Sequence, residues 1–326
     1  MHSLDSSNTT DKETAFDERA YFDKVQLTVE EVSKALLGKE HQIRLALCCL
    51  FSGGHLLIED LPGMGKTTLS YALAKALGLN FTRIQFTSDL LPADILGISI
   101  FDQANTSFEF HPGPIFSQLV LADEINRTTP KTQSALLEAM EERQVTVDGE
   151  TRELPDPFFV IATQNPVSLS GTYPLPESQL DRFLMRLHLG YPDQRAERAL
   201  LEMSTERDKV EAVNQCLSLT EIEQFRKKSA TVVASDSLLD YAQRLIAFTR
   251  SMEDAHFGLS PRGSIAMMRA AKTWALMSGR SHAVPEDIQA ILPAVVEHRL
   301  RTSIDEDGRS GASAVQRMLN EVDVIK

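Results

Sequence analysis

A short glycine-containing segment constrains the fold of this chain more than any other feature. It reads Leu61-Pro62-Gly63-Met64-Gly65-Lys66-Thr67-Thr68. The apolar run at 55–59 before it is typical of a buried strand, and the run at 69–77 after it is typical of a helix that ends at Gly78. A turn of small residues between a strand and a helix offers backbone N–H groups and the positive end of the helix dipole to a polyphosphate. This context predicts a phosphate-binding loop that takes ATP.

Two side chains of this loop can be given roles. We expect Lys66 to bind the β- and γ-phosphates and the Thr67 hydroxyl to ligate Mg²⁺. The predicted nucleotide-binding residues here are Pro62, Gly63, Met64, Gly65, Lys66, Thr67 and Thr68. One residue departs from the usual pattern, which has glycine where this chain has Asp60. Because a carboxylate beside phosphates is unfavourable, we expect the Asp60 side chain to point away from them.

A second apolar run ends in two adjacent acids. Residues 119–122 are all apolar and are followed by Asp123 and Glu124. In P-loop ATPases the first such acid holds the Mg²⁺ shell, and the second can polarise the attacking water. Asp123 fits the first role, and Glu124 fits the second as general base. Taken alone, the pair would fit the N-terminal cap of a following helix equally well, but the phosphate loop upstream favours the catalytic interpretation.

Apolar runs that alternate with helical stretches predict an α/β domain with a parallel sheet over residues 25–191. The predicted strands are 55–59, 83–86, 119–122 and 158–162. An amphipathic helix is predicted at 131–142, with Thr128 or Thr129 as its cap.

Strand signals stop after Tyr191-Pro192, and residues 192–326 predict a smaller all-helical domain with a C-terminal tail. Its predicted helices lie at 238–252, 262–277 and 285–299, and a capping box is predicted at Thr220-Glu221-Ile222-Glu223. At the other end, residues 1–24 are polar and predict a mobile tail.

Composition narrows the class of function. The formal net charge of −13 disfavours a nonspecific nucleic-acid clamp, which needs Lys and Arg to neutralise phosphates. The cysteines Cys48, Cys49 and Cys216 fit neither a disulfide framework nor a zinc site, so we expect small buried hydrophobic residues. No apolar run is long enough to cross a membrane, and the first residues do not resemble a secretory signal. The expected location is the cytoplasm, without membrane insertion.

Longer strings of the sequence resemble the MoxR family of AAA+ ATPases. They are Leu121-Ala122-Asp123-Glu124-Ile125-Asn126-Arg127, Lys131-Thr132-Gln133-Ser134-Ala135-Leu136-Leu137-Glu138-Ala139-Met140-Glu141-Glu142, Ala162-Thr163-Gln164-Asn165-Pro166, Gly171-Thr172-Tyr173-Pro174-Leu175-Pro176-Glu177 and Leu180-Asp181-Arg182-Phe183. The similarity extends over roughly residues 32–301 and includes Glu59-Asp60-Leu61-Pro62-Gly63, with its aspartate. The resemblance implies an AAA+ P-loop core followed by a helical lid domain.

The resemblance also implies roles for residues outside the loop. Asn165 matches sensor 1, which orients the attacking water or reads the γ-phosphate; otherwise it is a turn-forming residue before Pro166. Arg182 matches the arginine finger, which neutralises transition-state charge on a neighbour's ATP; otherwise it is an intramolecular partner of Asp181.

Two further positions follow from the same resemblance. Arg262 matches sensor 2 at the start of a lid helix, where we expect it to reach ATP from within the same chain. A cation at a helix N-terminus is locally unfavourable, which indicates a reason for its presence. Gly38 lies where the family packs the adenine, although it would also fit a simple helix break.

Two hairpin-like segments match the family as well. Residues 98–110 match its insert within the second helix, and residues 144–157, with the turn Asp148-Gly149, match the hairpin before sensor 1. In rings of this kind such elements tend to face the central pore, and the alternative is that they are ordinary surface hairpins.

The function that the resemblance implies is ATP-driven remodelling, maturation or activation of partner proteins by a ring, with a hexamer expected. The partners of such proteins often carry von Willebrand factor A domains or metal cofactors. A second hypothesis is a nucleotide-dependent binding switch with little steady ATPase activity. A third, a DNA-acting motor, is disfavoured by the acidic charge and by the absence of a basic tract.

Overall fold

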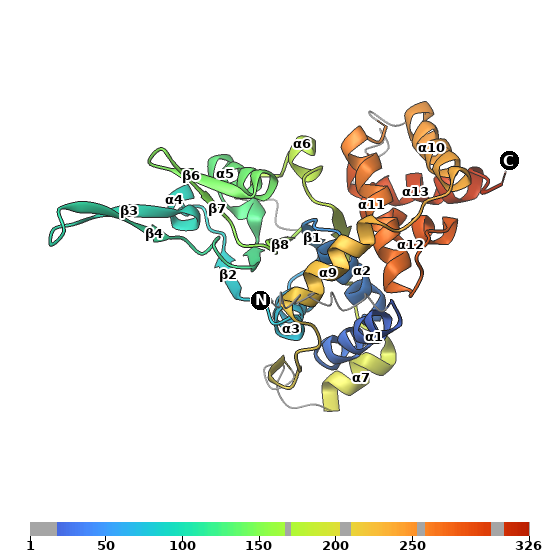
Figure 1. Ribbon diagram of the computed structural model, residues 1–326, viewed down its shortest axis with the longest axis horizontal. Coiled ribbons are helices and arrows are strands. Elements are labelled where there is room, and N and C mark those ends of the chain that lie inside the picture. The colour runs from blue at the N-terminus through green and yellow to red at the C-terminus, as the bar shows by residue number, and fades with distance from the viewer. Residues whose placement is uncertain (1–17, 167–170, 203–209, 253–257, 301–309, 326) are drawn as a thin grey trace, which may run out of the picture.

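The computed structural model describes residues 18–166, 171–202, 210–252, 258–300 and 310–325 (Figure 1). Its core is a parallel sheet with the strand order β2-β5-β8-β1-β9. These strands are β1 (Leu56–Glu59), β2 (Phe81–Gln85), β5 (Leu119–Asp123), β8 (Phe159–Gln164) and β9 (Met185–Leu187). In the centre, Ile161 of β8 lies opposite Leu56 on one side and Leu121 on the other. The predicted α/β fold with a parallel sheet is confirmed, and β9 is a strand that the sequence pattern did not reveal.

Successive residues of the strands enter two different hydrophobic cores. Leu56 and Ile58 pack in the core that holds the helices α1 (Glu18–Ala35), α2 (Glu40–Phe51) and α3 (Lys66–Ala76). Leu57, between them, packs in the core that holds α5 (Pro130–Glu142). Because both faces of the sheet are covered, its strands read as continuous apolar runs rather than as alternating ones.

Two antiparallel hairpins project from this core (Figure 1). The longer one consists of β3 (Gly97–Asp102) and β4 (Ser107–Pro112) and follows the short helix α4 (Pro92–Leu96). The second consists of β6 (Gln144–Val147) and β7 (Glu150–Glu153). Its turn residues Asp148 and Gly149 have φ values of 54° and 82°, as a two-residue hairpin turn requires. Both predicted hairpins are confirmed as elements.

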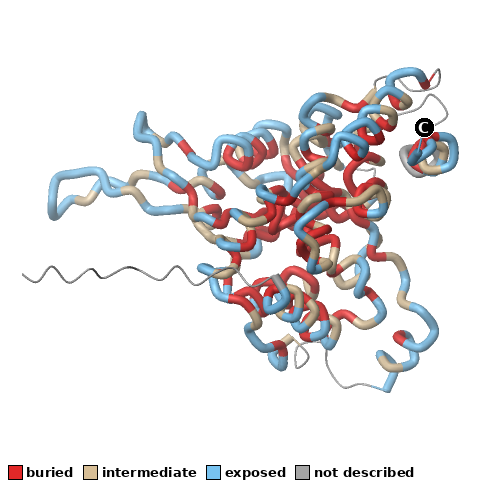
Figure 2. Tube along the Cα trace, turned by 45° about the vertical axis from the view of Figure 1, so that its right-hand side comes forward, coloured by how far each residue is buried: buried red, intermediate tan, exposed pale blue. Residues whose placement is uncertain are grey.

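In the described chain beyond β9, helices are joined by loops, with one isolated β-bridge between Val233 and His282. These helices are α7 (Gln194–Glu202), α9 (Leu219–Ala230), α10 (Asp236–Ser251), α11 (Pro261–Met277), α12 (Pro285–Val296), the 3₁₀-helix η2 (Glu297–Arg299) and α13 (Ser310–Glu321). Helix α11 packs against α1, α2 and α9, so the helical domain and the first core share one continuous hydrophobic interior. Figure 2 shows this interior as buried segments in the centre, with exposed chain at the periphery.

Three details differ from the sequence predictions. Helix α1 begins at Glu18, inside the segment assigned to the tail, because apolar residues such as Tyr21 and Val25 pack on the core; residues 1–17 lie outside the described residues. The capping box of α9 joins Ser218 to Glu221 rather than starting at Thr220, because the Ser218 side chain reaches the free N–H group of Glu221.

The cysteines are the third detail. Cys48 and Cys49 are fully buried, and burial raises the pKa of the Cys48 thiol to about 12, so both behave as the expected small hydrophobic residues. Cys216 is only half-buried, because it lies on the loop before α9. Among the helices that the structure describes, none combines the length and the apolarity needed to span a bilayer.

Candidate nucleotide-binding site

The predicted phosphate-binding loop connects the end of β1 to the start of α3. Gly63 and Gly65 have φ values of 80° and 88°, a left-handed conformation that residues with a side chain rarely adopt. A Cβ atom on Gly65 would also lie only 2.5 Å from Cδ1 of Leu36. Helix α3 begins at Lys66, so its free N–H groups open toward this loop.

Lys66 lies folded against the loop. Its Nζ donates hydrogen bonds to the backbone oxygens of Asp60 and Leu61, at 2.5 and 3.1 Å. Burial lowers the pKa of the Lys66 ammonium, while the negative charges of Asp60, Asp123 and Glu124 act in the opposite direction. A partly desolvated ammonium beside free helix N–H groups is a suitable partner for phosphate oxygens.

The carboxylate of Asp60 is occupied by backbone N–H groups. Its Oδ1 accepts a hydrogen bond from the Leu61 amide at 3.0 Å, and its Oδ2 accepts one from the Gly190 amide at 2.7 Å. Gly190 lies just beyond β9, on the segment that leads to the helical domain. The aspartate that replaces the usual glycine therefore joins the phosphate loop to the connection between the two domains.

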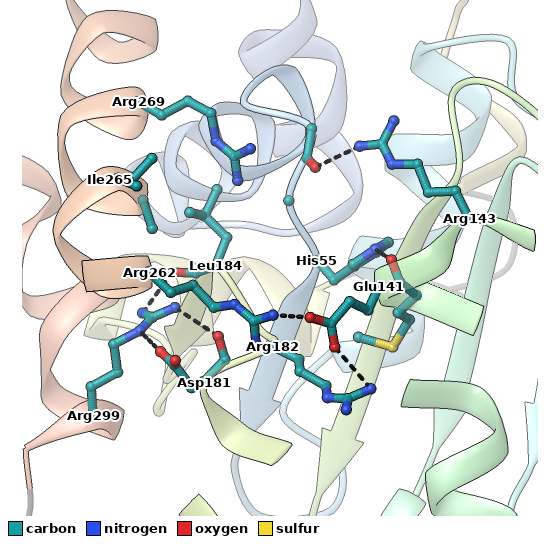
Figure 3. Close-up of a pocket in the computed structure, with 14 residues that line it drawn as sticks. His55, Glu141, Arg143, Asp181, Arg182, Leu184, Arg262, Ile265, Arg269 and Arg299 are labelled. Carbon is teal, nitrogen blue, oxygen red and sulfur yellow. Dashed lines mark hydrogen bonds and ion pairs between the residues drawn. The ribbon is translucent and has the colours of Figure 1, made fainter. Parts of the chain in front are cut away.

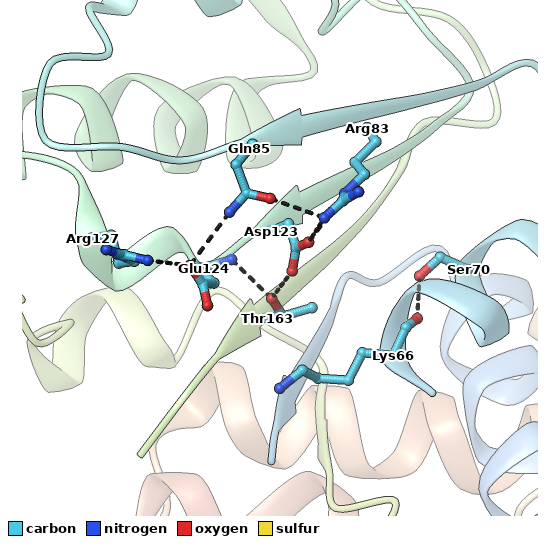
Figure 4. Close-up of polar contacts among 8 residues, drawn as sticks. All are labelled: Lys66, Ser70, Arg83, Gln85, Asp123, Glu124, Arg127 and Thr163. Atoms are coloured by element: carbon cyan, nitrogen blue, oxygen red, sulfur yellow. Dashed lines mark hydrogen bonds and ion pairs between the residues drawn. The ribbon is translucent and has the colours of Figure 1, made fainter. Parts of the chain in front are cut away.

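The two predicted catalytic acids lie where β5 ends (Figure 4). Asp123 is buried, and its Oδ1 accepts a hydrogen bond from the Thr163 hydroxyl at 2.6 Å, while its Oδ2 forms an ion pair with Arg83 at 2.6 Å. Neither acid caps α5, whose N-cap residue is Thr129. Glu124 is the N-cap residue of the short 3₁₀-helix η1 (Ile125–Arg127), but its side chain makes no cap hydrogen bond there.

Glu124 has a left-handed backbone, with φ 58° and ψ 50°. Its amide donates to the Thr163 hydroxyl at 2.8 Å, which fixes the backbone directly beside Asp123. Its Oε2 accepts hydrogen bonds from Arg127 at 2.9 Å and from Gln85 at 3.4 Å (Figure 4). The side chain is thus held over the end of β5 by residues on both sides of it.

Asn165 directly follows β8, the strand between β5 and β1. Parallel strands end at the same edge of a sheet, so Asn165, the acids and the phosphate loop share the carboxyl edge. The oxygen donors of Thr67 and Asp123 fit Mg²⁺, which is usually held by one or two carboxylates together with substrate phosphates. The described residues contain no cluster of three or more His, Cys, Asp or Glu that would form an all-protein metal cage.

A cavity of about 360 Å³ adjoins the phosphate loop and is lined mostly by apolar residues. Its walls come from the end of α1, from the loop, from the connection after β9 and from α7; they include Leu36, Leu37, Met64, Tyr191, Leu200 and Leu201. Gly38 is not among these lining residues. It lies between Leu37 and Lys39, which do line the cavity. Its φ is 70°, and a Cβ atom there would lie 3.0 Å from Cβ of Ala196, so Gly38 allows α7 to pack closely beside the cavity.

Arg182 and Arg262 lie together, and Glu141 joins them (Figure 3). Arg182 Nη1 is 3.2 Å from Glu141 Oε2, and Arg262 forms an ion pair with the other oxygen of the same carboxylate. Asp181 is not the partner of Arg182, because it pairs with Arg299 at 2.7 Å. The alternative to the arginine-finger role made Arg182 an intramolecular partner of Asp181. Within the chain its acidic partner is Glu141.

These arginines line a second cavity, of about 560 Å³, where five arginines face only two acids. Gly54 and His55, which precede β1, and Leu184, which precedes β9, also line it. The cavity thus lies at the amino edge of the sheet, opposite the phosphate loop. The expectation that Arg262 reaches ATP within its own chain is not met in this arrangement, because Arg262 pairs with Glu141 near the end of α5 and lines the cavity at the edge of the sheet opposite the loop.

The comparisons with known proteins agree with this architecture. Residues 55–185 match the family model described as "ATPase family associated with various cellular activities (AAA)", and residues 247–318 match "AAA lid domain". Chaperone MoxR1 of Mycobacterium tuberculosis is 37% identical over 91% of this chain and 81% of its own length. Protein MoxR of Methylorubrum extorquens is 30% identical over 83% of this chain and 85% of its own.

The chain belongs to the MoxR family of AAA+ ATPases. A further relative, the uncharacterized protein YeaC of Bacillus subtilis, is 45% identical over 91% of this chain and 93% of its own length. A crystal structure of a candidate ATPase from Cytophaga hutchinsonii superposes with a TM-score of 0.85 at 36% identity, covering 95% of this chain and 97% of the other.

Sequence reasoning missed several residues of this MoxR-family site. Arg83 and Gln85, which contact the two acids, lie on a strand that was predicted only for its apolar content. Glu141 was quoted only as part of a family string, and a charge on the outer face of a helix gives no signal of its partners. Thr163, which bonds to both Asp123 and Glu124, could have been suspected from its place beside Asn165 at a strand end.

Proposed function

We propose that this MoxR-family chain binds and hydrolyses ATP with Mg²⁺ and that it does so in a ring. Lys66 and the free N–H groups of α3 would bind the phosphates, and the apolar cavity beside the loop would receive the base. Thr67 and Asp123 would hold Mg²⁺, which when bound neutralises charge on the phosphate oxygens. Glu124 would accept the proton of the attacking water, and Asn165 would orient that water.

The observation that carries the ring proposal is the separation of the two sets of residues. The phosphate loop and the acids lie at the carboxyl edge of the sheet, whereas Arg182 and Arg262 lie at the amino edge. The two arginines of one chain therefore cannot serve the loop of the same chain in this arrangement. A head-to-tail contact between copies would bring them to a neighbour's ATP, and repetition of that contact closes a ring, for which we expect six subunits.

The work of this ring is proposed to be the remodelling or activation of partner proteins. One relative carries the name chaperone, which supports this class of activity. The β3–β4 hairpin exposes apolar side chains, among them Phe101 and Phe108, whose rings are 5.3 Å apart. Exposed apolar residues on a projecting element are suited to contact a partner protein. Partners with von Willebrand factor A domains or metal cofactors, met in the cytoplasm where ATP is available, remain our expectation from the family.

Glu124→Gln tests the proposed function, because it keeps the shape of the side chain but removes the base. We expect the steady rate of ATP hydrolysis to fall by about 10² or more while ATP still binds. The matched control is Asp240→Asn, an acid-to-amide change at an exposed position of α10 in the helical domain, which should leave the rate unchanged. A wild-type protein that binds ATP but shows no steady hydrolysis, alone or with partners, would favour the alternative of a nucleotide-dependent switch.

A further inference from the structure

Arg83 forms an ion pair with Asp123, the acid that is proposed to hold Mg²⁺. It lies on β2, the edge strand of the sheet. Its Nη2 and Nε both donate to Oδ2 of Asp123, at 2.6 and 3.1 Å, and Nη2 also donates to Oε1 of Gln85 at 2.9 Å (Figure 4). A guanidinium that binds one carboxylate oxygen through two N–H groups makes a strong, oriented ion pair.

Both carboxylate oxygens of Asp123 accept hydrogen bonds. Its Oδ1 accepts from the Thr163 hydroxyl at 2.6 Å, and its Oδ2 is the oxygen held by Arg83. The two partners differ in kind. Thr163 is neutral and also accepts from the Glu124 amide, so it orients the strand end. Among the described residues that contact this carboxylate, Arg83 is the one that carries a positive charge.

The exposure of the two side chains shows which of them is free to move. The side chain of Asp123 is 10% exposed, whereas that of Arg83 is 43% exposed. A carboxylate that is buried without a countercharge is costly, so Asp123 requires a cation whether or not a metal is present. A long arginine at a sheet edge can withdraw into water at little cost.

We propose that Arg83 is a positioning residue that serves as the countercharge of Asp123 until Mg²⁺ arrives with the nucleotide. This inference rests on the proposed ATP site. Arg83 and Mg²⁺ compete for the same carboxylate, so the ion pair weakens the retention of metal by the filled site. In the absence of metal, the same ion pair keeps the charge of Asp123 from repelling the phosphates.

Competition of this kind predicts opposite changes for two binding constants. Arg83→Gln should tighten the binding of the nucleotide with Mg²⁺, because no cation has to be displaced. It should weaken binding without metal, because an uncompensated carboxylate then faces the phosphates. The ratio of the dissociation constant measured in EDTA to that measured in Mg²⁺ should therefore rise about tenfold or more.

The measurement is a fluorescence titration with a labelled non-hydrolysable ATP analogue, in MgCl₂ and in EDTA at equal ionic strength. Arg317→Gln is the matched control, because Arg317 is about as exposed as Arg83 and pairs with Glu321 on α13, away from the two acids. It should leave the ratio near the wild-type value, as should Arg83→Lys, which keeps the charge. An unchanged ratio in Arg83→Gln, or an equal rise in Arg317→Gln, would overturn the proposal.

A second set of variants tests whether Arg83 acts through Asp123. In an Asp123→Asn background there is no carboxylate charge to balance, so Arg83→Gln should no longer change binding in EDTA. A loss of binding in EDTA that persists in this background would show that Arg83 acts elsewhere and would refute the assignment. Wild-type protein that binds the analogue under neither condition would overturn the ATP site itself, which is a distinguishable result.

Discussion

A mixing experiment tests whether the proposed ATP site is shared between neighbouring subunits, with the phosphate loop from one subunit and the arginines from the next. Lys66→Ala removes the ammonium that lies against the phosphate loop, and Arg182→Ala removes the arginine at the opposite edge of the sheet. Each variant alone should be nearly inactive, the first because nucleotide binding is weakened and the second because a finger arginine accelerates phosphoryl transfer by about 10³ or more. Mixed rings should regain activity at junctions where an Arg182→Ala subunit holds ATP and its Lys66→Ala neighbour supplies the arginine.

The size of the recovery follows from the geometry of a head-to-tail ring. A junction is active only when the subunit that holds ATP is Arg182→Ala and the neighbour that supplies the arginine is Lys66→Ala. With random assembly, the active fraction of junctions is the product of the two mole fractions, so the rate should peak at about a quarter of wild type in an equal mixture. This maximum does not depend on the number of subunits in the ring. The assay is the ATPase rate against mixing ratio, with assembly followed by light scattering.

The same assay decides on which side of the junction Arg262 acts. Because Arg182 and Arg262 share the carboxylate of Glu141, we expect both to serve the neighbour's ATP. In a mixture of Arg182→Ala and Arg262→Ala, no subunit then carries an intact pair, and no activity should return. If Arg262 instead reached ATP in its own chain, this mixture would also recover about a quarter of the wild-type rate.

Two outcomes would refute the reasoning. One is a rate that stays at zero when Lys66→Ala and Arg182→Ala subunits demonstrably exchange within rings. The other is full ATPase activity in a strict monomer, since a single chain has the arginines and the loop at opposite edges of the sheet.

The remaining predictions concern single sites. Lys66→Ala should weaken the binding of a non-hydrolysable ATP analogue by about 1.5–3 kcal/mol in calorimetry, and unchanged affinity would mean that the loop is not the site. Asp60→Gly should change the affinity for the analogue little, because the Asp60 carboxylate binds the Leu61 and Gly190 amides rather than the nucleotide. Loss of these two hydrogen bonds should lower the free energy of unfolding by about 1–3 kcal/mol. Asp60→Asn keeps an acceptor oxygen and should lower the free energy of unfolding less. His55 is buried, and burial lowers its pKa from 6.5 to about 4. Between these pH values the unfolded chain therefore binds more protons than the folded chain. The free energy of unfolding should fall by about 3 kcal/mol as the pH drops through this range. Denaturant unfolding across this pH range should show a shallower fall in His55→Gln, and an identical fall would contradict the assignment.

The grouping of the proposed nucleotide-binding segments at one edge of the sheet could be predicted from the sequence, because each segment directly follows a strand. The phosphate loop, the two acids and Asn165 each follow directly after an apolar strand. Once a sheet is parallel, every such strand end lies at one edge, so adjacency in space follows from position along each strand. The apolar content of the strands also indicated that helices cover both faces of the sheet, as the two hydrophobic cores show.

Contacts between distant segments could not be predicted in the same way. Nothing in the sequence indicates that Arg83 pairs with Asp123, or that Asp60 accepts from Gly190, because these contacts depend on strand order and on the path of the chain after β9. The resemblance placed Gly38 at the adenine; the close approach of Ala196 to Gly38 is a further contact that only the tertiary structure shows.

Arg262 shows the difference most clearly. The sequence determined that an arginine begins a helix of the lid domain, and the resemblance gave it a role at ATP. Only the tertiary structure decided where this arginine lies, because α11 packs against α1, α2 and α9 and Arg262 pairs with Glu141 at the amino edge of the sheet. Local sequence determines which chemical groups a strand end or a helix end offers. The packing of helices from distant parts of the chain determines which of those groups meet.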